Sequence, residues 1–529
     1  MSWAQDLAPP IIWSIAGNDS GGGAGLSADA RMAAAFGVHL CPVVATLTAQ
    51  NSLGVQGLWP VPIDQLRAQL QALASDLRPR AIKTGLLGSA AQVELICEFV
   101  DHLRAQGPVA LLVDPVLSAS AGGADFGHEA LLRAYREHLL PRTDLLTPNR
   151  REAERLLGLA AGSGEPQAMA ARLQALGAVS VCITGGDDAS TAHELAIDWL
   201  SSPLASGHLA LPRLPSTHHH GTGCSFTSAA AAASARGFAM PDAVLLAKMA
   251  TWCAVRDGYA AGAWAGPVRA LDDFVSEPRA MPVMSFGAEA LDAATLARWT
   301  EVLQREPKPH SPLGLYAITE RPARVAELAA AGLPQIQLRL KREQVRDEQE
   351  LRDAIDAALQ AVAGSPSRLW INDHWQIALA AGAQALHLGQ EDWGALSPDE
   401  RARLLSSGAL LGLSSHSLWE LARARSLAPH YIACGPVWPT STKTMPWQAQ
   451  GMDNLAWWVR MAGCPVVAIG GILAPEQVKA CAEQGAAAVC LVRALEQKPS
   501  RLAQFQAAFE QGRSRPAMGA IQPPHPALI

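Results

Sequence analysis

Eight short apolar runs in the second half of the sequence constrain its fold more than any other feature. A helix-compatible segment follows each run before the next one begins. The runs are "LGLYAI" from 313, "QIQL" from 335, "LWI" from 369, "ALHL" from 385, "LLGL" from 410, "YIAC" from 431, "VVAI" from 466 and "AVCLV" from 488. Eight strand–helix units within about 200 residues predict a compact (β/α)8 barrel.

The first half of the chain also alternates apolar strand-like runs with helical patterns. The strand candidates are "IIWSIA", "VVATLT", "ALLVDPV", "DLLTPN" and "VSVCIT". Residues 63–77 are amphipathic with helical spacing. This alternation indicates an α/β fold with a doubly wound sheet.

Proline-rich segments interrupt the two patterned regions. Both "SEPRAMPVMSFG" and "QREPKPHSP" are typical of a connector, with a short helical run between them. The end of the chain, "SRPAMGAIQPPHPALI", is typical of disorder. We therefore expect a first domain at 11–275, a linker at 276–312, a barrel at 313–512 and a disordered tail at 513–529.

Composition narrows the class of protein. The net charge of −6 gives no basic surface for nucleic acid, and no stretch of about 18 apolar residues predicts a membrane span. The nine cysteines form no C-x-x-C pair and lie mostly in apolar runs, which indicates reduced, buried thiols. The N-terminus lacks the basic region of a signal peptide. We expect a cytoplasmic protein with small-molecule partners, no nucleic acid and no membrane; homo-oligomerisation stays undetermined.

A glycine-rich turn joins a strand to a helix in "SIAGNDSGGGAGLSADARMAAAFG" (14–37). No Lys-Ser/Thr pair follows the glycines, so the turn is not a Walker A loop. The fragment Gly23-x-Gly25-x-x-Ala28 is similar to a dinucleotide fingerprint, but no ribose-binding acid follows at the usual spacing. Any tight strand-to-helix turn needs glycines, and this pattern alone does not identify a ligand.

The stretch "HHHGTGCSF" (218–226) has two interpretations. Three histidines and a cysteine are typical metal ligands, but consecutive side chains in an extended segment point to alternating faces. The following alanine-rich run predicts a helix that ends at Gly237, and its free N–H groups favour an anion. Gly221 and Gly223 let the backbone approach a phosphoryl group. We therefore favour phosphate binding here.

Five motifs of the first half occur together. They are "AGNDSGGGAGLSAD", "TAQNS" (48–52), "VDPVL" (113–117), "TPNRREAERL" (147–156) and "HGTGCSFTSA" (220–229). In this order they resemble hydroxymethylpyrimidine/phosphomethylpyrimidine kinase, of the ribokinase-like superfamily. The resemblance covers essentially all of 11–275 and implies an ATP-dependent phosphotransferase.

The resemblance also implies roles for single residues. It assigns the pyrimidine to Gly17, Asp29 and Gln50, and the phosphates of ATP to Asn149, Glu152, Gly185, Gly221 and Gly223. Asn149 and Glu152 would hold Mg²⁺ partly through water. Cys224 would take the substrate's hydroxyl proton, with its pKa lowered by the helix N-terminus.

Three of these assignments have a plainer alternative in the residues themselves. Gln50 can be a surface amide, Glu152 can be part of a helix start, and Cys224 can be a buried structural thiol. The chain also departs from the family pattern, because Thr184 and Ser120 stand where the family has lysines. The loss of two cations near the phosphates leaves it open whether both phosphorylation steps occur.

Polar residues follow several strands of the predicted barrel, where barrel enzymes keep their sites. Asn372 and Asp373 follow the third strand, Asp392 follows the fourth, and Gly470-Gly471 follows the seventh. Two aspartates on adjacent strands can share a Mg²⁺ whose other ligands are water and phosphate oxygens. Two glycines can expose N–H groups to a phosphate.

These motifs resemble thiamine-phosphate synthase over roughly 313–500: a Gln-x-Arg-x-Lys run, "IND", "HLGQED", "GPVWPTSTK" and "AIGGI". For the pyrimidine diphosphate the resemblance implies Gln337, Arg339, Lys341, Asn372, Ser414 and Lys443. For the thiazole phosphate it implies Thr440, Thr442, Gly471, Val492 and Arg493, and for Mg²⁺ it implies Asp373 and Asp392. Lys443, with Arg339 and Lys341, would stabilise the departing diphosphate. Family members often have serine at the position of Arg493, which would grip the thiazole phosphate or block the site.

The two resemblances describe consecutive chemistry, because the kinase would make the pyrimidine diphosphate that the synthase condenses with thiazole phosphate. Two alternatives stay open. One is a kinase of broader vitamin specificity, acting for example on pyridoxal. The other is a barrel that only binds thiamine phosphate or thiazole phosphate as a sensor.

Overall fold

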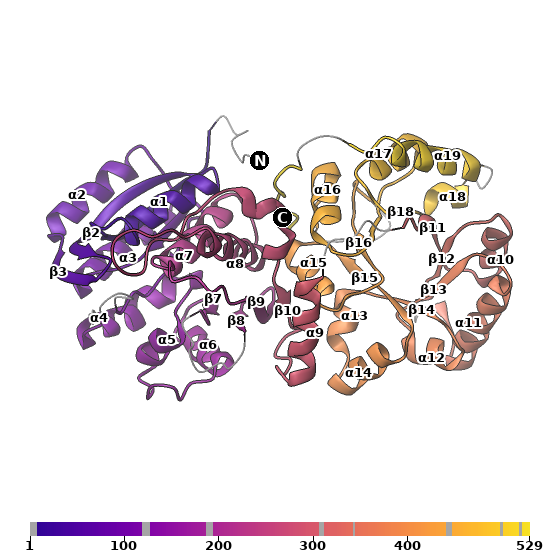
Figure 1. The fold of residues 1–529 in the computed structure, drawn as a ribbon, viewed down its shortest axis with the longest axis horizontal. Helices are drawn as coiled ribbons and strands as arrows, with labels where there is room; N and C mark the ends of the chain where they lie inside the picture. The colour runs from indigo at the N-terminus through magenta and orange to yellow at the C-terminus, as the bar shows by residue number, and fades with distance from the viewer. Residues whose placement is uncertain are drawn as a thin grey trace. The chain divides into compact units, whose positions relative to one another are not determined.

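The computed structural model describes residues 8–118, 127–186, 194–305, 311–341, 344–440, 447–497, 501–517 and 521–528. The chain divides into two compact units, Met1–Ala290 and Leu291–Ile529. Figure 1 labels their helices and strands along the chain. Both units are α/β, as the sequence predicts.

The first unit contains a ten-stranded mixed sheet in the order β10-β9-β8-β7-β6-β5-β4-β1-β2-β3. Strands β2, β1, β4, β5, β6 and β7 run parallel to one another, and antiparallel strands extend the sheet at both edges. The strands are β1 Ile11–Asn18, β2 His39–Asn51, β3 Gly54–Pro60, β4 Ala81–Thr84, β5 Ala110–Val113, β6 Leu145–Leu146, β7 Ser180–Ile183, β8 Leu195–Ser201, β9 Ser206–Pro212 and β10 Val283–Met284.

Helices cover this sheet. They are α1 Gly25–Ala35, α2 Ile63–Ala74, α3 Ala90–Arg104, α4 Glu129–Ala134, α5 Arg150–Leu157, α6 Pro166–Ala175, α7 Thr222–Ala235 and α8 Met240–Arg256. Short π and 3-10 turns lie at Tyr135–Leu139, Leu140–Arg142, Asp273–Ser276 and Pro278–Ala280.

Helix α7 is the central helix of the first unit. Its run from Ala229 to Ala233 is fully buried, because alanine lets α7 pack closely on β4, β5, α1 and α8. The helix starts at a left-handed Gly221 and is followed by Gly237, with φ values of 87° and 94°. Its N-terminus, with Cys224, therefore lies at the carboxyl ends of the central strands.

Part of the predicted linker belongs to this first unit. Val283 and Met284 pair antiparallel with β9, and both are buried. Burial of these apolar side chains at the sheet edge explains why the segment is not a free connector there. Helix α9, Ala293–Gln304, lies in the second unit.

The second unit is a closed barrel of eight parallel strands, β11 to β18 in sequence order. The strands are β11 Gly314–Thr319, β12 Gln335–Leu338, β13 Arg368–Asn372, β14 Ala385–Leu388, β15 Leu410–Ser415, β16 Tyr431–Cys434, β17 Val466–Ala468 and β18 Ala488–Leu491. The helices after α9 are α10 Pro322–Ala330, α11 Glu348–Val362, α12 Trp375–Ala380, α13 Gln390–Ala395, α14 Pro398–Ser406, α15 Leu418–Arg425, α16 Gly451–Met461, α17 Pro475–Glu483, α18 Arg493–Gln497 and α19 Leu502–Arg513. All eight apolar runs in the sequence coincide with these strands.

Large side chains fill the interior of the barrel. Tyr316, Trp370 and Tyr431 pack there with smaller residues of β14, β16, β17 and β18. A Cβ at position 412 would overlap the ring of Tyr431, so Gly412 makes room for this tyrosine. The barrel is therefore a packed core with its polar groups at one end of the strands.

The end of the chain differs from the predicted disordered tail. Residues 521–528 hydrogen-bond to the start of α16, and Ala527 is 1% exposed. The prediction rested on proline content alone, and prolines also suit an extended segment packed on a surface.

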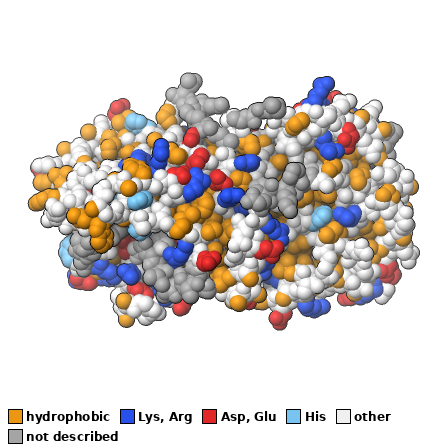
Figure 2. All heavy atoms as spheres, in the orientation of Figure 1, with side chains coloured by type: hydrophobic (Ala, Val, Ile, Leu, Met, Phe, Trp, Pro, Cys, Tyr) orange, Lys and Arg blue, Asp and Glu red, His pale blue; other side chains and the backbone are white. Residues whose placement is uncertain are grey.

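Two further properties bear on ligands and partners. Basic and acidic side chains are interspersed on the face of the molecule in Figure 2, without an extended patch of one sign. Among the described residues, no helix combines the length and apolar composition needed to cross a membrane.

Candidate active sites

The glycine-rich turn after β1 is organised by Asp19. Its carboxylate accepts the N–H groups of Gly21, Gly23 and Ala24 at 2.8–3.0 Å. Burial opposes ionisation of Asp19, but the hydrogen bond with His220 and the backbone donors outweigh it and lower the pKa. The loop is thus closed around an internal anion.

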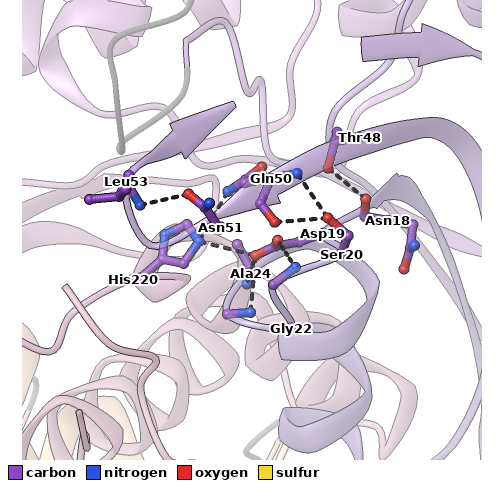
Figure 3. A network of polar contacts seen from close by, with 12 residues as sticks. Asn18, Asp19, Ser20, Gly22, Ala24, Thr48, Gln50, Asn51, Leu53 and His220 are labelled. Carbon is purple, nitrogen blue, oxygen red and sulfur yellow. Dashed lines mark hydrogen bonds and ion pairs between the residues drawn. The ribbon is translucent and has the colours of Figure 1, made fainter. Parts of the chain in front are cut away.

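His220 connects this loop to the end of β2 (Figure 3). Its Nε2 atom lies 3.1 Å from both Asp19 Oδ2 and Gln50 Nε2. One ring nitrogen cannot donate to Asp19 and accept from Gln50 at once, so the tautomer of His220 selects its partner. His218 has a different partner, the N–H of Gly266 at 3.2 Å. The consecutive histidines therefore serve separate contacts.

The two glycine loops pack backbone against backbone. A Cβ at Gly221 would overlap the carbonyl oxygen of Gly23, and one at Gly23 would overlap the His220 ring. A Cβ at Gly223 would meet nothing within 4 Å, and Gly223 is exposed. The N-terminus of α7 therefore presents an open backbone next to the first glycine loop, as anion binding requires.

Cys224 lies beside a buried group of charges. Although the residue is partly exposed, burial of the thiol raises its pKa, and the charge of Lys83 opposes this only in part. The prediction of a lowered pKa for Cys224 is therefore wrong, because desolvation outweighs the helix N-terminus. The charge of Asp114, which follows β5, also raises the pKa of the thiol, so the two groups lie close together.

Asp114 is a second proton-binding group at this position. It is 4% exposed, and burial raises the pKa of its carboxyl to about 6, against the lowering effect of Lys83. Its Oδ2 atom has no hydrogen-bond partner among the described residues. An ionised, under-satisfied carboxylate beside a thiol is suited to accept a proton.

Asp29, which the sequence assigns to the pyrimidine, contacts buried protein groups. Its carboxylate is fully buried and accepts bonds from Ser14 Oγ at 2.5 Å, Ser228 Oγ at 2.7 Å and Lys83 Nζ at 2.9 and 3.1 Å. Protein donors thus occupy both oxygens. Asp29 holds Lys83 under the site.

Asn149 and Glu152 form a capping box at the start of α5. Asn149 Oδ1 accepts the N–H of Glu152, and Glu152 Oε2 accepts that of Asn149, both at 2.9 Å. The Leu117 N–H also donates to Glu152 Oε1 at 3.4 Å. The structure therefore shows the helix-start alternative, and any metal role for this pair comes in addition.

Other predicted kinase residues surround the same end of the sheet. Thr184 pairs with Asn149, and the N–H of Gly185 donates to Asp198 Oδ1 at 2.9 Å. Gly17 is buried at the end of β1, with its carbonyl oxygen close to Gly25. Ser120 lies outside the described residues.

The barrel brings two acidic residues together at its carboxyl end. Asp373, at a left-handed φ of 62°, follows β13, and Asp392 lies in the first turn of α13. Burial and the charge of Asp392 together raise the pKa of Asp373 to about 6, and Arg339 and Asn372 oppose the shift. A hard divalent cation would relieve this repulsion, and these carboxylates are the ligand type Mg²⁺ prefers.

A chain of hydrogen bonds crosses the barrel interior beneath these aspartates. Gln337 Nε2 donates to Tyr316 Oη at 3.1 Å, and the hydroxyls of Tyr316 and Tyr431 are 2.8 Å apart. His387 then links Tyr431 at 2.7 Å to Ser414 Oγ at 2.9 Å. Burial lowers the pKa of His387 to about 3, so the imidazole is neutral. Two predicted diphosphate ligands, Gln337 and Ser414, are thereby joined.

Loops after β16, β17 and β18 complete this end of the barrel. Gly470 and Gly471, with φ of 95° and 70°, pack against residues 436–439, next to Thr440. Val492 packs on the barrel core, and Arg493 starts α18. Lys341 is exposed after β12. Thr442 and Lys443 lie outside the described residues.

Several residues at these sites were not among those predicted from sequence. They are Asp19, Lys83, Asp114, His220, Tyr316, His387 and Tyr431. Asp19, Asp114, His220 and His387 stand inside the recognised motifs, which was an available signal. Lys83 and the tyrosines lie within apolar strands, where nothing local distinguishes them.

Comparison with known proteins gives matches in both units. The phosphomethylpyrimidine kinase family model matches residues 19–269, and the thiamine monophosphate synthase model matches residues 315–495. A probable thiamine biosynthetic bifunctional enzyme, chloroplastic, from Oryza sativa is 31% identical over 519 residues, covering 95% of this chain and 89% of that protein.

Shorter relatives match the first unit. A hydroxymethylpyrimidine/phosphomethylpyrimidine kinase from Streptomyces coelicolor is 38% identical over 263 residues, covering 50% of this chain and 94% of that protein. A solved pyridoxal kinase from Bacillus subtilis, in complex with ADP, is 28% identical with a TM-score of 0.45, covering 50% of this chain and 98% of that one.

Proposed function

Since this chain belongs to the family of bifunctional thiamine biosynthetic enzymes, we propose that the two sites described above carry its two activities. The first half is a hydroxymethylpyrimidine and phosphomethylpyrimidine kinase that uses ATP, and the second half is a thiamine-phosphate synthase.

For the kinase, we assign proton transfer to Cys224 and Asp114 acting together. As the substrate oxygen attacks the γ-phosphorus, its proton passes to the Cys224 sulfur while the thiol proton passes to Asp114. The bond from the γ-phosphorus to the bridging oxygen breaks, and its electron pair leaves with ADP. Two observations support this: Asp114 lies close enough to the thiol for its charge to raise the thiol pKa, and its own pKa of about 6 leaves it ionised at neutral pH.

The remaining kinase residues position the reactants. Gln50 and Gly17 would contact the pyrimidine. The turn at Gly221 and the open backbone at Gly223 would cradle the transferred phosphoryl group. Asn149 and Glu152 would hold Mg²⁺ on the ATP phosphates through water, because their direct contacts are already those of a capping box.

For the synthase, the supporting observation is the close pair Asp373 and Asp392. These residues would hold Mg²⁺, which neutralises charge on the diphosphate when bound. Arg339, Lys341 and Lys443 would bind the diphosphate oxygens, and the Gln337 and Ser414 side chains would be held in place by the interior hydrogen-bond chain. Thr440, Thr442 and Gly471 would bind the thiazole phosphate, with Val492 and Arg493 at its edge.

The kinase assignment makes a sharp distinction between the two phosphorylation steps. A hydroxyl must lose a proton on attack, whereas a phosphate monoester with a second pKa of about 6 is mostly ionised at neutral pH. Cys224→Ala should therefore slow the first step by about 10²- to 10⁴-fold and the second step far less. Cys97→Ala, which alters a buried thiol on α3, is the matched control.

The experiment supplies each variant with hydroxymethylpyrimidine or its phosphate, plus ATP, Mg²⁺ and thiazole phosphate, and identifies products. Cys224→Ala should recover thiamine phosphate formation when given the phosphate or diphosphate, and Asp392→Ala should not. Equal loss in both phosphorylation steps would sink the proton-transfer role. Phosphorylation rates on pyridoxal and on hydroxymethylpyrimidine are compared. A strong preference for pyridoxal would favour the alternative of a kinase with broader vitamin specificity.

A further inference from the structure

The end of the chain binds to the start of α16 through one buried asparagine. The N–H of His525 donates to Asn454 Oδ1 at 2.9 Å, and Asn454 Nδ2 donates to the carbonyl of His525 at 3.1 Å. Asn454 is fully buried. It therefore recognises both backbone groups of a residue that the sequence assigns to a disordered tail.

The same C-terminal segment, residues 521–528, pairs with the chain just before α16. The N–H of Gln448 donates to the carbonyl of Ala527 at 2.8 Å, and Trp447 and Leu528 form an antiparallel bridge. His525 Nε2 lies 2.9 Å from the carbonyl oxygen of Gln450. The segment thus adds a short extended strand to residues 447–450.

Gln450 hydrogen-bonds to two barrel loops as well as to the C-terminal segment. It is fully buried, its N–H donates to the carbonyl of Pro436 and its Nε2 to that of His416, both at 2.7 Å. Its Oε1 accepts from Asn454 Nδ2 at 2.8 Å. The rings of His416 and Trp447 also stack, 5.7 Å apart at 12°. Gln450 therefore joins the loops after β15 and β16 to the C-terminal segment.

These two loops carry proposed ligands of the synthase. Ser414 is the penultimate residue of β15, two residues before His416, and Thr440 follows Pro436 in the loop after β16. Gly470 and Gly471 pack on that second loop as well. Any shift of Gln450 would move the groups assigned to the diphosphate and to the thiazole phosphate.

We propose that the C-terminal segment, through Asn454 and Gln450, is a positioning element that holds the loops after β15 and β16 in their substrate-binding shape. This inference rests on the ligand assignments proposed above. Gln450 and Asn454 are positioning residues, since no substrate contact is assigned to them. Because loop shape sets substrate affinity, losing the segment should raise KM more than it lowers kcat.

The test uses a truncated chain that ends at Ala517, and full-length chains that carry His525→Ala or the conservative His525→Gln. The glutamine keeps a donor for the Gln450 carbonyl. Gln522→Ala is the control, as its side chain has no hydrogen bond within the described residues. KM and kcat are measured for thiazole phosphate and for the pyrimidine diphosphate. The kinase activity of each preparation is the internal reference for enzyme concentration, and the melting temperature reports folding of the barrel.

Truncation should raise the KM for thiazole phosphate by about tenfold, and His525→Ala by about two- to fivefold, from hydrogen bonds worth about 1 kcal/mol each. His525→Gln, Gln522→Ala and the kinase rates should match the original protein. Unchanged KM values after truncation overturn the proposal, as does a fall in kcat alone with a lower melting temperature. If truncation raises the KM for thiazole phosphate while Thr440→Ala leaves that KM unchanged, the positioning role stands and the assignment of Thr440 to the thiazole phosphate is wrong.

Discussion

The buried ion pair of Lys83 and Asp29 offers a direct test of how the kinase site is supported. Lys83 Nζ lies 2.9 and 3.1 Å from the two carboxylate oxygens, and both side chains are fully buried. Burial acts to lower the pKa of Lys83, but Asp29, Cys224 and Asp114 outweigh it and raise the pKa. The lysine is therefore charged, and its removal leaves Asp29 without its cation.

Lys83→Met retains most of the side-chain volume and removes the charge. Breaking a buried pair by deleting one partner costs about 3–5 kcal/mol. Ser14 and Ser228 still donate to Asp29, so we expect the lower end, about 3 kcal/mol. At about 2–4 °C per kcal/mol, the kinase unit should melt about 6–12 °C lower.

Calorimetry of the full chain measures this effect, with the kinase transition identified as the one that ATP shifts upward. The synthase transition should not move. Asp29→Asn with Lys83→Met should recover at least half of the loss, because no uncompensated charge remains. Arg67→Met, which breaks the exposed pair with Glu98, should leave the transition in place. A shift below about 2 °C for Lys83→Met, or simple additivity in the double variant, would refute this reasoning.

Three other predictions concern the loops and their charges. Gly221→Ala should reduce kinase activity at least about tenfold and spare the synthase, because a Cβ there meets Gly23 and φ is 87°; both activities are assayed on one preparation. Asp114 has a folded pKa of about 6, above its unfolded value of about 3.9, so the stability it contributes is complete below about pH 4 and is lost as pH rises through 6. The free energy of unfolding of the kinase unit should accordingly fall by about 3 kcal/mol between about pH 4 and pH 6. Thermal melting across this range measures the fall, and Asp114→Asn should remove it. Asp373→Asn should raise the Mg²⁺ concentration for half-maximal synthase activity at least about tenfold, with the kinase requirement unchanged, in parallel Mg²⁺ titrations.

The sequence predicts the fold well because periodicity and turn residues are local signals. All eight barrel strands coincide with apolar runs, and the motifs and their order indicate both enzyme families. Asp373 and Asp392 follow adjacent strands, so parallel pairing alone places them at one edge. Such inferences need only the chain direction and the strand order.

The sequence by itself determined which chemical groups this protein carries, in which order, and on which strand ends they stand. Only the tertiary structure decided their state, because burial and long-range partners set it. Asp29 is paired with Lys83 inside the first unit, and the Cys224 thiol has a raised rather than a lowered pKa. Residues 521–528 are held against α16 through Asn454, a partner that composition cannot reveal.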